Sequence, residues 1–165
     1  MGMLQYDTLL VHGSAVCADG EAFLFTAPSG TGKTTHTRLW LSEIPGTYVV
    51  NGDKPLIRLL PDRIEVCGTP WSGKEGLNRR VNVPLKAICF LERGERNEIS
   101  RTSFRETYPL LMQQCYRPTK PEAMRRTLEL ISRLGEETAF YRLRCNMEPE
   151  AALVAYNGMV RDASV

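Results

Sequence analysis

The sequence contains no long hydrophobic run. Its apolar stretch at residues 8–11 stops at His12-Gly13-Ser14, and this stretch is far shorter than a secretory signal or a membrane-spanning helix requires. We therefore expect a cytoplasmic protein that has no membrane partner.

Cysteine is sparse and irregularly placed. The five cysteines stand at positions 17, 67, 89, 115 and 145, and no two of them form a Cys-x-x-Cys pair. An odd number of cysteines at wide spacing is atypical of a zinc site or a disulfide framework. We expect reduced thiols that serve as small core residues.

The sequence also lacks a marked excess of charge of one sign. Lysine and arginine total 21 against 19 aspartate and glutamate residues, which gives a net charge of +2. Domains that bind nucleic acid usually carry a strongly basic surface, so nucleic acid is not expected as a partner.

What the chain does have is the composition of an ordinary globular domain. Hydrophobic residues make up 42% and charged residues 24% of its 165 positions. A chain of this size buries enough apolar surface to fold without a disulfide or a structural metal. Neither an internal repeat nor a linker-like stretch divides it. We expect a single domain over residues 1–165.

The order of apolar strands, turns and helical patterns favours an α/β fold. Strands are expected at residues 6–17, 22–26, 48–50, 55–60, 63–67, 85–91 and 139–145, with a hairpin in the first pair and another around Pro61-Asp62. Helices are expected at residues 33–42, 104–116, 121–134 and 148–161. Pro109 would interrupt the second helix or mark its start, and Gly135 would end the third. This mixture predicts a mixed β-sheet flanked by helices.

Residues 27–35 read Ala-Pro-Ser-Gly-Thr-Gly-Lys-Thr-Thr and match the Walker A pattern at its Gly-Lys-Thr end, with Ala27 replacing the usual first glycine. Gly30 and Gly32 allow backbone N–H groups to surround a phosphate, and the start of the following helix adds a positive dipole end. Lys33 would contact the β- and γ-phosphates, and Thr34 would bind Mg²⁺. The predicted nucleotide-binding residues are Ser29, Gly30, Thr31, Gly32, Lys33, Thr34 and Thr35.

Other residues narrow the class of P-loop protein. The sequence has no Asn-Lys-x-Asp, Asp-x-x-Gly or Leu-Ser-Gly-Gly motif, which argues against a GTPase or a transport ATPase. A P-loop enzyme also needs an acidic residue after a neighbouring strand, where it holds Mg²⁺. Asp53, which follows the apolar stretch at residues 48–50, is the candidate for that role.

Residues 10–16, Leu-Val-His-Gly-Ser-Ala-Val, are followed by a predicted hairpin and then by the P-loop at residues 29–35. This arrangement resembles the nucleotide-binding core of phosphoenolpyruvate carboxykinases and the catalytic domain of bacterial HPr serine kinase/phosphorylase. Both families carry a histidine on the strand before the P-loop and an acidic pair after the following strand. The resemblance covers residues 8–60, and here Gly52-Asp53-Lys54 supplies only one carboxylate of that pair.

The resemblance implies ATP with Mg²⁺, or alternatively Mn²⁺, as cofactors. His12 would lie near the metal or the transferred phosphoryl group. Asp53 would bind the metal or act as the base that takes a proton from the acceptor hydroxyl. The resemblance also implies self-association into a homo-oligomer. Carboxykinase activity itself is not expected, because 165 residues leave no room for that family's large substrate domain.

Two further features are less diagnostic. Residues 68–81 form a glycine-rich stretch in which Trp71, Lys74, Arg79 and Arg80 suit a lid over phosphates or an acceptor, with a solvated loop as the alternative. His36 lies one turn into the helix after the P-loop and is expected to be structural or solvent-facing.

Three functions are therefore open. The first is an ATP-dependent kinase that transfers the γ-phosphoryl group to a hydroxyl of a protein, a peptide or a small molecule. The second is a regulatory or assembly module that binds nucleotide with little turnover, which the single carboxylate at residues 52–54 favours. The third is a phosphorylase or phosphatase that runs the reverse chemistry on the same residues.

Overall fold

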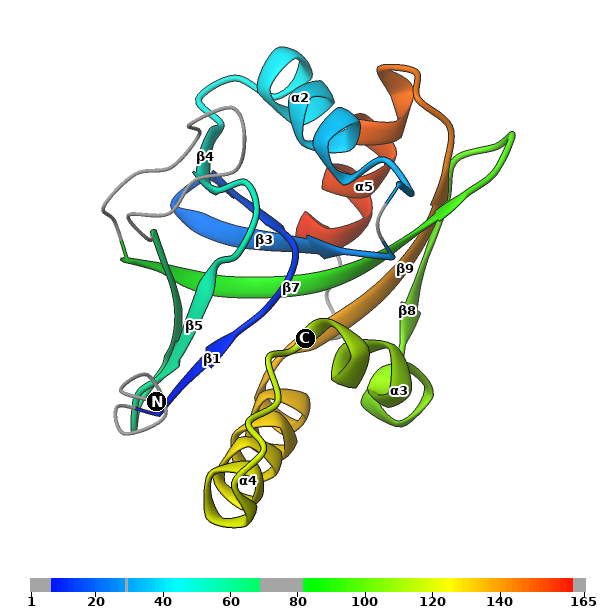
Figure 1. Cartoon of the computed structure of the whole chain (residues 1–165). Helices are drawn as coiled ribbons and strands as arrows, with labels where there is room; N and C mark the ends of the chain where they lie inside the picture. The colour runs from blue at the N-terminus through cyan, green and yellow to red at the C-terminus, as the bar shows by residue number, and fades with distance from the viewer. Residues whose placement is uncertain (1–6, 29, 69–81, 162–165) are drawn as a thin grey trace.

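The computed structural model describes residues 7–28, 30–68 and 82–161 (Figure 1). Its strands are β1 Thr8–Leu10, β2 Ser14–Ala18, β3 Glu21–Thr26, β4 Tyr48–Asn51, β5 Leu56–Leu59, β6 Ile64–Cys67, β7 Asn82–Arg93, β8 Glu98–Thr102 and β9 Ala139–Cys145. Its helices are α2 Lys33–Glu43, α3 Phe104–Gln114, α4 Pro121–Glu137 and α5 Glu150–Val160. None of the helices in these ranges is long and apolar enough to cross a membrane.

A mixed sheet in the order β4-β2-β3-β7-β9-β8 forms the centre of the fold. Strands β3, β7 and β9 run parallel, whereas β2 is antiparallel to both β3 and β4. The first residues of β7 also pair with β6, and this pairing attaches the antiparallel strands β1, β5 and β6 to the sheet. The fold is therefore of the α/β class, with a mixed β-sheet flanked by helices, as the sequence predicts.

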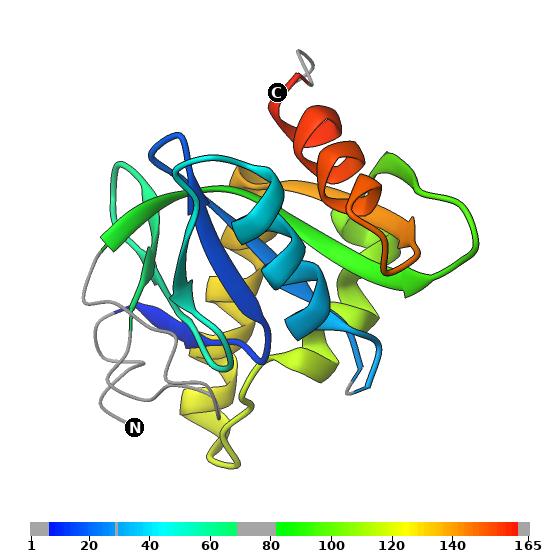
Figure 2. The same ribbon diagram turned by 90° about the horizontal axis from the view of Figure 1, so that it is seen from above.

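Helices cover both faces of the sheet (Figures 1 and 2). Phe23 and Phe25 of β3 project to one face, where they pack against Trp40 of α2 at ring-centroid distances of 5.1 and 5.2 Å. Leu24 projects to the other face and belongs to a second apolar cluster that includes Leu111 of α3 and residues of α4. The period-two alternation along β3 thus places one buried layer on each side of the sheet.

The stretch at residues 6–17 does not form the single strand that the sequence predicts. It divides into β1, which pairs with β5, and β2, which pairs with β3 and β4. The break lies at Gly13, where an added Cβ would stand 2.7 Å from the carbonyl oxygen of Phe25. Glycine therefore lets the chain pass close to β3 while it changes direction between the two pairings.

Two strands differ from the sequence expectation. Strand β7 spans Asn82–Arg93 instead of residues 85–91, because its first residues pair with β6 as well. Strand β8 at Glu98–Thr102 was not predicted, since its residues Glu-Ile-Ser-Arg-Thr have little apolar alternation. Antiparallel pairing with β9 keeps β8 extended despite this polar composition.

Two helices also differ in their bounds. Helix α3 runs through Pro109 without interruption and ends at Gln114. Its start is well capped, since the Ser103 side chain accepts a hydrogen bond from the Glu106 backbone N–H at 3.1 Å. Helix α4 continues past Gly135 to Glu137. Gly135 serves packing here, because an added Cβ would lie 2.3 Å from the Phe104 ring.

The five cysteines are free thiols. Three of them, Cys17, Cys89 and Cys115, are buried as expected, whereas Cys67 and Cys145 are half-buried. Burial raises the pKa of the Cys115 thiol to about 12, so this group is protonated at neutral pH and inert as a nucleophile.

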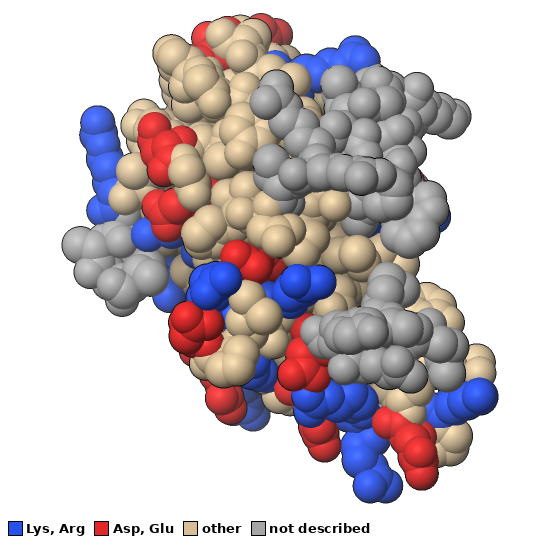
Figure 3. All heavy atoms as spheres, turned by 90° about the vertical axis from the view of Figure 1, so that its left-hand side faces the viewer, with Lys and Arg blue, Asp and Glu red and all other residues tan. Residues whose placement is uncertain are grey.

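Charged side chains of both signs are interspersed on the face shown in Figure 3. Acidic and basic residues lie beside one another there, and the coloured residues form no broad area of a single sign.

His36 is a structural residue of the core. Its ring is 2% exposed, and its Nε2 accepts a hydrogen bond from Trp40 Nε1 at 3.0 Å. The proton of the neutral ring therefore lies on Nδ1, for which the described residues provide no hydrogen-bond partner. Burial lowers the pKa of His36 from 6.5 to about 4.

We expect this histidine to make the fold sensitive to acid. The unfolded chain binds the proton near pH 6.5 and the folded chain only near pH 4. The contribution of neutral His36 to the free energy of unfolding is therefore fully present above about pH 6.5 and is lost as the pH falls to about 4. Linkage gives a loss of about 3 kcal/mol in the free energy of unfolding. Urea unfolding across this pH range measures it. His36→Gln, whose side-chain oxygen can accept from Trp40, should flatten the curve, and an equally steep curve for this variant would refute the assignment.

Candidate active site

The glycine-rich loop at residues 27–32 connects the end of β3 to the start of α2. Gly30 and Gly32 adopt φ values of +85° and +114°, a region that side chains with a Cβ rarely occupy. Helix α2 begins immediately afterwards at Lys33. The loop therefore has the backbone freedom and the helix N-terminus that the Walker A pattern predicts.

Arg93, at the end of β7, holds this loop from outside. Its Nη2 donates to the carbonyl oxygen of Gly30 at 2.6 Å, and its Nε donates to that of Thr31 at 3.2 Å. In a planar trans peptide the C=O and the following N–H point in opposite directions. Arg93 thus draws two carbonyl groups toward itself and turns the amide groups of the same peptides away from it.

Lys33 reaches back over the same loop. Its Nζ donates to the carbonyl oxygen of Ala27 at 2.7 Å. Partial burial lowers the pKa of Lys33, and the negative charge of nearby Asp53 opposes that shift. The ammonium group is therefore held between the loop and the carboxylate, where an incoming anion would meet it.

His12 and Asp53 come together at the other side of the loop. His12 lies between β1 and β2, Asp53 follows β4, and the distance from His12 Nε2 to Asp53 Oδ1 is 3.6 Å. Both side chains are a little over one third exposed, at 38% and 37%. Each group is thus open to a ligand and close to the other.

Hydrogen bonds to the backbone hold the two segments that carry His12 and Asp53. Asn51 is buried, and its Oδ1 accepts hydrogen bonds from the backbone N–H groups of Asp53 and Lys54, both at 2.8 Å. This Asx turn sets the direction in which the chain leaves β4. The Gly13 N–H donates to the Asp53 carbonyl oxygen at 3.0 Å, which ties the two segments to each other.

The His12 segment is also held by the far end of α3. The His12 N–H donates to the carbonyl oxygen of Gln114 at 2.7 Å, and the Tyr116 N–H donates to that of Leu10 at 2.8 Å. The Thr26 hydroxyl donates to the His12 carbonyl oxygen at 3.0 Å. Together with the bond between Gly13 and Asp53, these contacts mean that three separate parts of the chain position His12.

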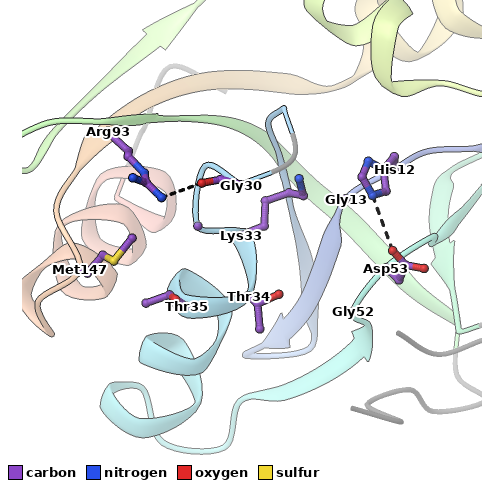
Figure 4. A pocket seen from close by; sticks show the side chains of 11 residues that line it. His12, Gly13, Gly30, Lys33, Thr34, Thr35, Gly52, Asp53, Arg93 and Met147 are labelled. Atoms are coloured by element: carbon purple, nitrogen blue, oxygen red, sulfur yellow. Dashed lines mark hydrogen bonds and ion pairs between the residues drawn. The ribbon is translucent and has the colours of Figure 1, made fainter. Parts of the chain in front are cut away.

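One open pocket of about 380 Å³ unites these groups (Figure 4). It is lined by His12, Gly13, Gly30, Gly32, Lys33, Thr34, Thr35, Gly52, Asp53, Arg93 and Met147. The structure thus brings together the predicted residues His12, Asp53 and Lys33, and most of the predicted nucleotide-binding loop. Ser29 and the predicted lid residues Trp71, Lys74, Arg79 and Arg80 lie outside the described residues.

Two residues that line this pocket, Thr34 and Asp53, carry oxygen atoms that could bind a divalent cation. Within the described ranges, no group of three His, Cys, Asp or Glu side chains could hold a metal by itself. Mg²⁺ does not require one, because it is usually bound through one or two carboxylates together with substrate phosphates and water. The Asp53 carboxylate and the Thr34 hydroxyl provide oxygen ligands that suit Mg²⁺ or Mn²⁺.

Four lining residues were not among the predicted site residues: Gly13 and Gly52, which are sequence neighbours of His12 and Asp53, and Arg93 and Met147. Arg93 follows an apolar strand, but so do other arginines of the chain, and no motif distinguishes it. Met147 lies between β9 and α5, and its Cε would be 3.4 Å from a Cβ added to Gly32. Only the parallel order of β3, β7 and β9 brings both residues to the loop.

Gly13 gives a direct test of this geometry. A Cβ at this position would stand 2.7 Å from the backbone oxygen of Phe25, so Gly13→Ala must displace the segment that carries His12. We expect a loss of about 1–3 kcal/mol in the free energy of unfolding and a fall in nucleotide-dependent activity. Gly20→Ala is the control, because Gly20 has φ +80° in the β2–β3 turn. It should lower the melting temperature and preserve activity, and equal activity in both variants would contradict the expectation.

Comparison with known proteins supports the fold. No family model matches the chain, and no curated protein matches it in sequence. Among solved structures, the HPr(Ser) kinase/phosphatase from Coxiella burnetii is similar, with a TM-score of 0.53 and 8% sequence identity. The match covers 92% of this chain and 97% of that chain. At this level of identity the likeness shows a shared fold, of the kind that the sequence resemblance implies.

Proposed function

We propose that this protein is a cytoplasmic, ATP-dependent phosphotransferase that moves the γ-phosphoryl group to a hydroxyl. The observation that carries the proposal is the convergence of Lys33, His12 and Asp53 on one pocket, with 3.6 Å between the histidine and the carboxylate. The fold similarity to an HPr(Ser) kinase/phosphatase agrees with a related kinase-like function.

The glycine-rich loop would bind the phosphates. Phosphoryl transfer depends mainly on positioning and on neutralising negative charge. In this proposal, backbone N–H groups of the loop and of the first turn of α2 surround the β-phosphate. Lys33 exchanges its hydrogen bond to Ala27 for contacts with the β- and γ-phosphates.

Asp53 would act as the base. Its carboxylate accepts the proton of the acceptor hydroxyl as that oxygen forms a bond to the γ-phosphorus, while the bond from phosphorus to the β–γ bridging oxygen breaks and ADP leaves. His12 lies 3.6 Å from the carboxylate, close enough to orient it and to contact the transferred phosphoryl group. Exposure of both side chains allows an acceptor hydroxyl to approach the carboxylate from the pocket.

Thr34 and Asp53 would hold the divalent cation together with the phosphate oxygens. The cation supplies positive charge that offsets the charge of the triphosphate. Because the chain offers one carboxylate at residues 52–54, Asp53 would serve both as a metal ligand and as a base, or Mg²⁺ would rely more heavily on phosphate and water.

That single carboxylate also supports a second candidate function. A regulatory module that binds nucleotide would need the loop and Lys33 but not a complete pair of acidic groups. A phosphorylase or phosphatase is the third candidate, because it would use the same residues in the reverse direction. The acceptor of a kinase would be a serine of a small protein, a peptide or a small metabolite.

The test is an assay of purified protein with γ-³²P-labelled ATP and Mg²⁺, with Mn²⁺ in a parallel series. Candidate acceptors are small proteins and peptides that contain serine, and hydroxyl-bearing metabolites. Transfer of label to an acceptor supports the kinase. Tight nucleotide binding without transfer supports the regulatory module, and release of phosphate from a phosphorylated acceptor supports the reverse chemistry.

A further inference from the structure

The two ends of the pocket differ in chemistry. Figure 4 shows His12 and Asp53 at one end and Arg93 and Met147 at the other, with the glycine-rich loop between them. The first end carries the carboxylate that proton transfer requires. The second presents a planar guanidinium and a thioether, which have no acid–base role near neutral pH.

We infer that the Arg93–Met147 end is the nucleoside subsite, where the base of the bound nucleotide packs on Met147 and Arg93. This inference rests on the proposed function, because that function fixes the direction of the nucleotide. The γ-phosphate must meet Asp53 and His12, and the β-phosphate must lie in the loop. The nucleoside then leaves the loop at the opposite end.

The subsite is held rigid by hydrogen bonds between two turns. The Gly94 N–H donates to the Cys145 carbonyl oxygen at 3.0 Å. The Asn146 N–H donates to Asn97 Oδ1 at 2.9 Å, and Asn146 Nδ2 donates to the Glu95 carbonyl oxygen at 3.2 Å. These bonds join the residues next to Arg93 to the residues next to Met147.

A further bond closes the turn that carries Met147, since the Glu148 N–H donates to Asn146 Oδ1 at 3.0 Å. Met147 is 50% exposed at the top of this turn. The backbone that carries this apolar side chain is thus fixed beside the phosphate-binding loop, and the side chain itself is accessible. A ligand would therefore not have to order this turn of the backbone on binding, which favours affinity.

Both side chains suit the flat face of a base. A thioether makes favourable contacts with aromatic rings, and a guanidinium stacks on them. The hydrogen bonds from Arg93 to Gly30 and Thr31 fix the plane of its guanidinium group. Stacking contacts involve the face of a base and not its hydrogen-bonding edge. Arg93 and Met147 should therefore contribute equally to the affinities for adenine and guanine nucleotides.

The test separates the nucleoside from its phosphates. Binding of ADP, GDP and pyrophosphate in the presence of Mg²⁺ is measured by calorimetry for the wild type, Met147→Ala and Leu153→Ala. We expect Met147→Ala to weaken the binding of ADP and of GDP by the same factor, about five- to tenfold. Its affinity for pyrophosphate should be unchanged. Leu153 is also an exposed apolar residue, at 41%, and lies on α5 outside the pocket. Its variant should bind all three ligands like the wild type.

A second measurement locates the base directly. Photolabelling with 8-azido-ATP should modify the peptide that contains Met147 and not the peptide that contains Asp53. Equal loss of ADP and pyrophosphate affinity in Met147→Ala, no loss of either, or a label near Asp53 would overturn the inference. If the wild type binds pyrophosphate as tightly as ADP and GDP, the nucleoside subsite is refuted, whereas the proposed phosphate site is not. A wild type that binds neither ligand would overturn the proposed function as well.

Discussion

Replacing Asp53 by asparagine is expected to lower kcat for phosphoryl transfer by about 10²–10⁴-fold, the usual contribution of a positioned general base. Asparagine keeps the size of the side chain and cannot accept the proton of the acceptor hydroxyl. The Asx turn built on Asn51 uses only the backbone of Asp53, so the local fold should survive. Single-turnover assays with labelled ATP and a working acceptor measure the effect.

Asp62→Asn is the matched control for this substitution. Asp62 is exposed in the β5–β6 turn, and its variant should transfer phosphate at the wild-type rate. Binding of ADP without Mg²⁺ should be nearly unchanged in Asp53→Asn, because the carboxylate does not hold the phosphates directly. If Asp53→Asn transfers the phosphoryl group at the wild-type rate, Asp53 is not the general base. The base would then be His12 or a group of the acceptor.

Replacing Lys33 by methionine is expected to weaken ATP binding by about 100-fold, since hydrogen bonds to charged groups are worth about 1.5–3 kcal/mol each. Methionine preserves most of the apolar length of the side chain and removes its charge. The loop also loses the bond from Nζ to the Ala27 carbonyl oxygen. Calorimetry with ATP and Mg²⁺ measures affinity, and thermal unfolding reports any loss of stability.

Lys120→Met serves as the comparison, because Lys120 stands exposed at the start of α4. It removes the same charge from the chain at a place remote in the fold from the glycine-rich loop. Its ATP affinity should match that of the wild type. Similar affinities for ATP in Lys33→Met and Lys120→Met would mean that the loop does not bind the triphosphate in the manner proposed.

Local patterns account for the part of the site that the sequence predicted. The strand, the loop at residues 27–32 and the helix beginning at Lys33 are consecutive, so the turn residues of the loop and the stop at Pro45-Gly46 were sufficient to place them. The hairpin of β5 and β6 was predictable for the same reason. Asp53 was identified because it follows the short apolar strand β4, and the structure places it at the pocket.

Long-range pairing accounts for what the sequence did not predict. The separation of β1 from β2 depends on the close approach of Gly13 to β3, which no local pattern encodes. Strand β8 is polar and is extended only because it pairs with β9. Arg93 and Met147 reach the loop because parallel strands end at one edge of the sheet, and that edge is known only once the strand order is known.

The hydrogen bond between His12 and Gln114 has a consequence for folding. The glycine-rich loop lies next to β3 and α2 in the sequence, and the most distant residue that hydrogen-bonds to it is Arg93, at the end of β7. The orientation of His12 requires a carbonyl group about a hundred positions later in the chain, and contacts of such sequence separation form slowly. During synthesis, the residues that hold the glycine-rich loop would thus all be present before the residue that orients His12. The acid–base pair would therefore be completed only after α3 has been made and docked.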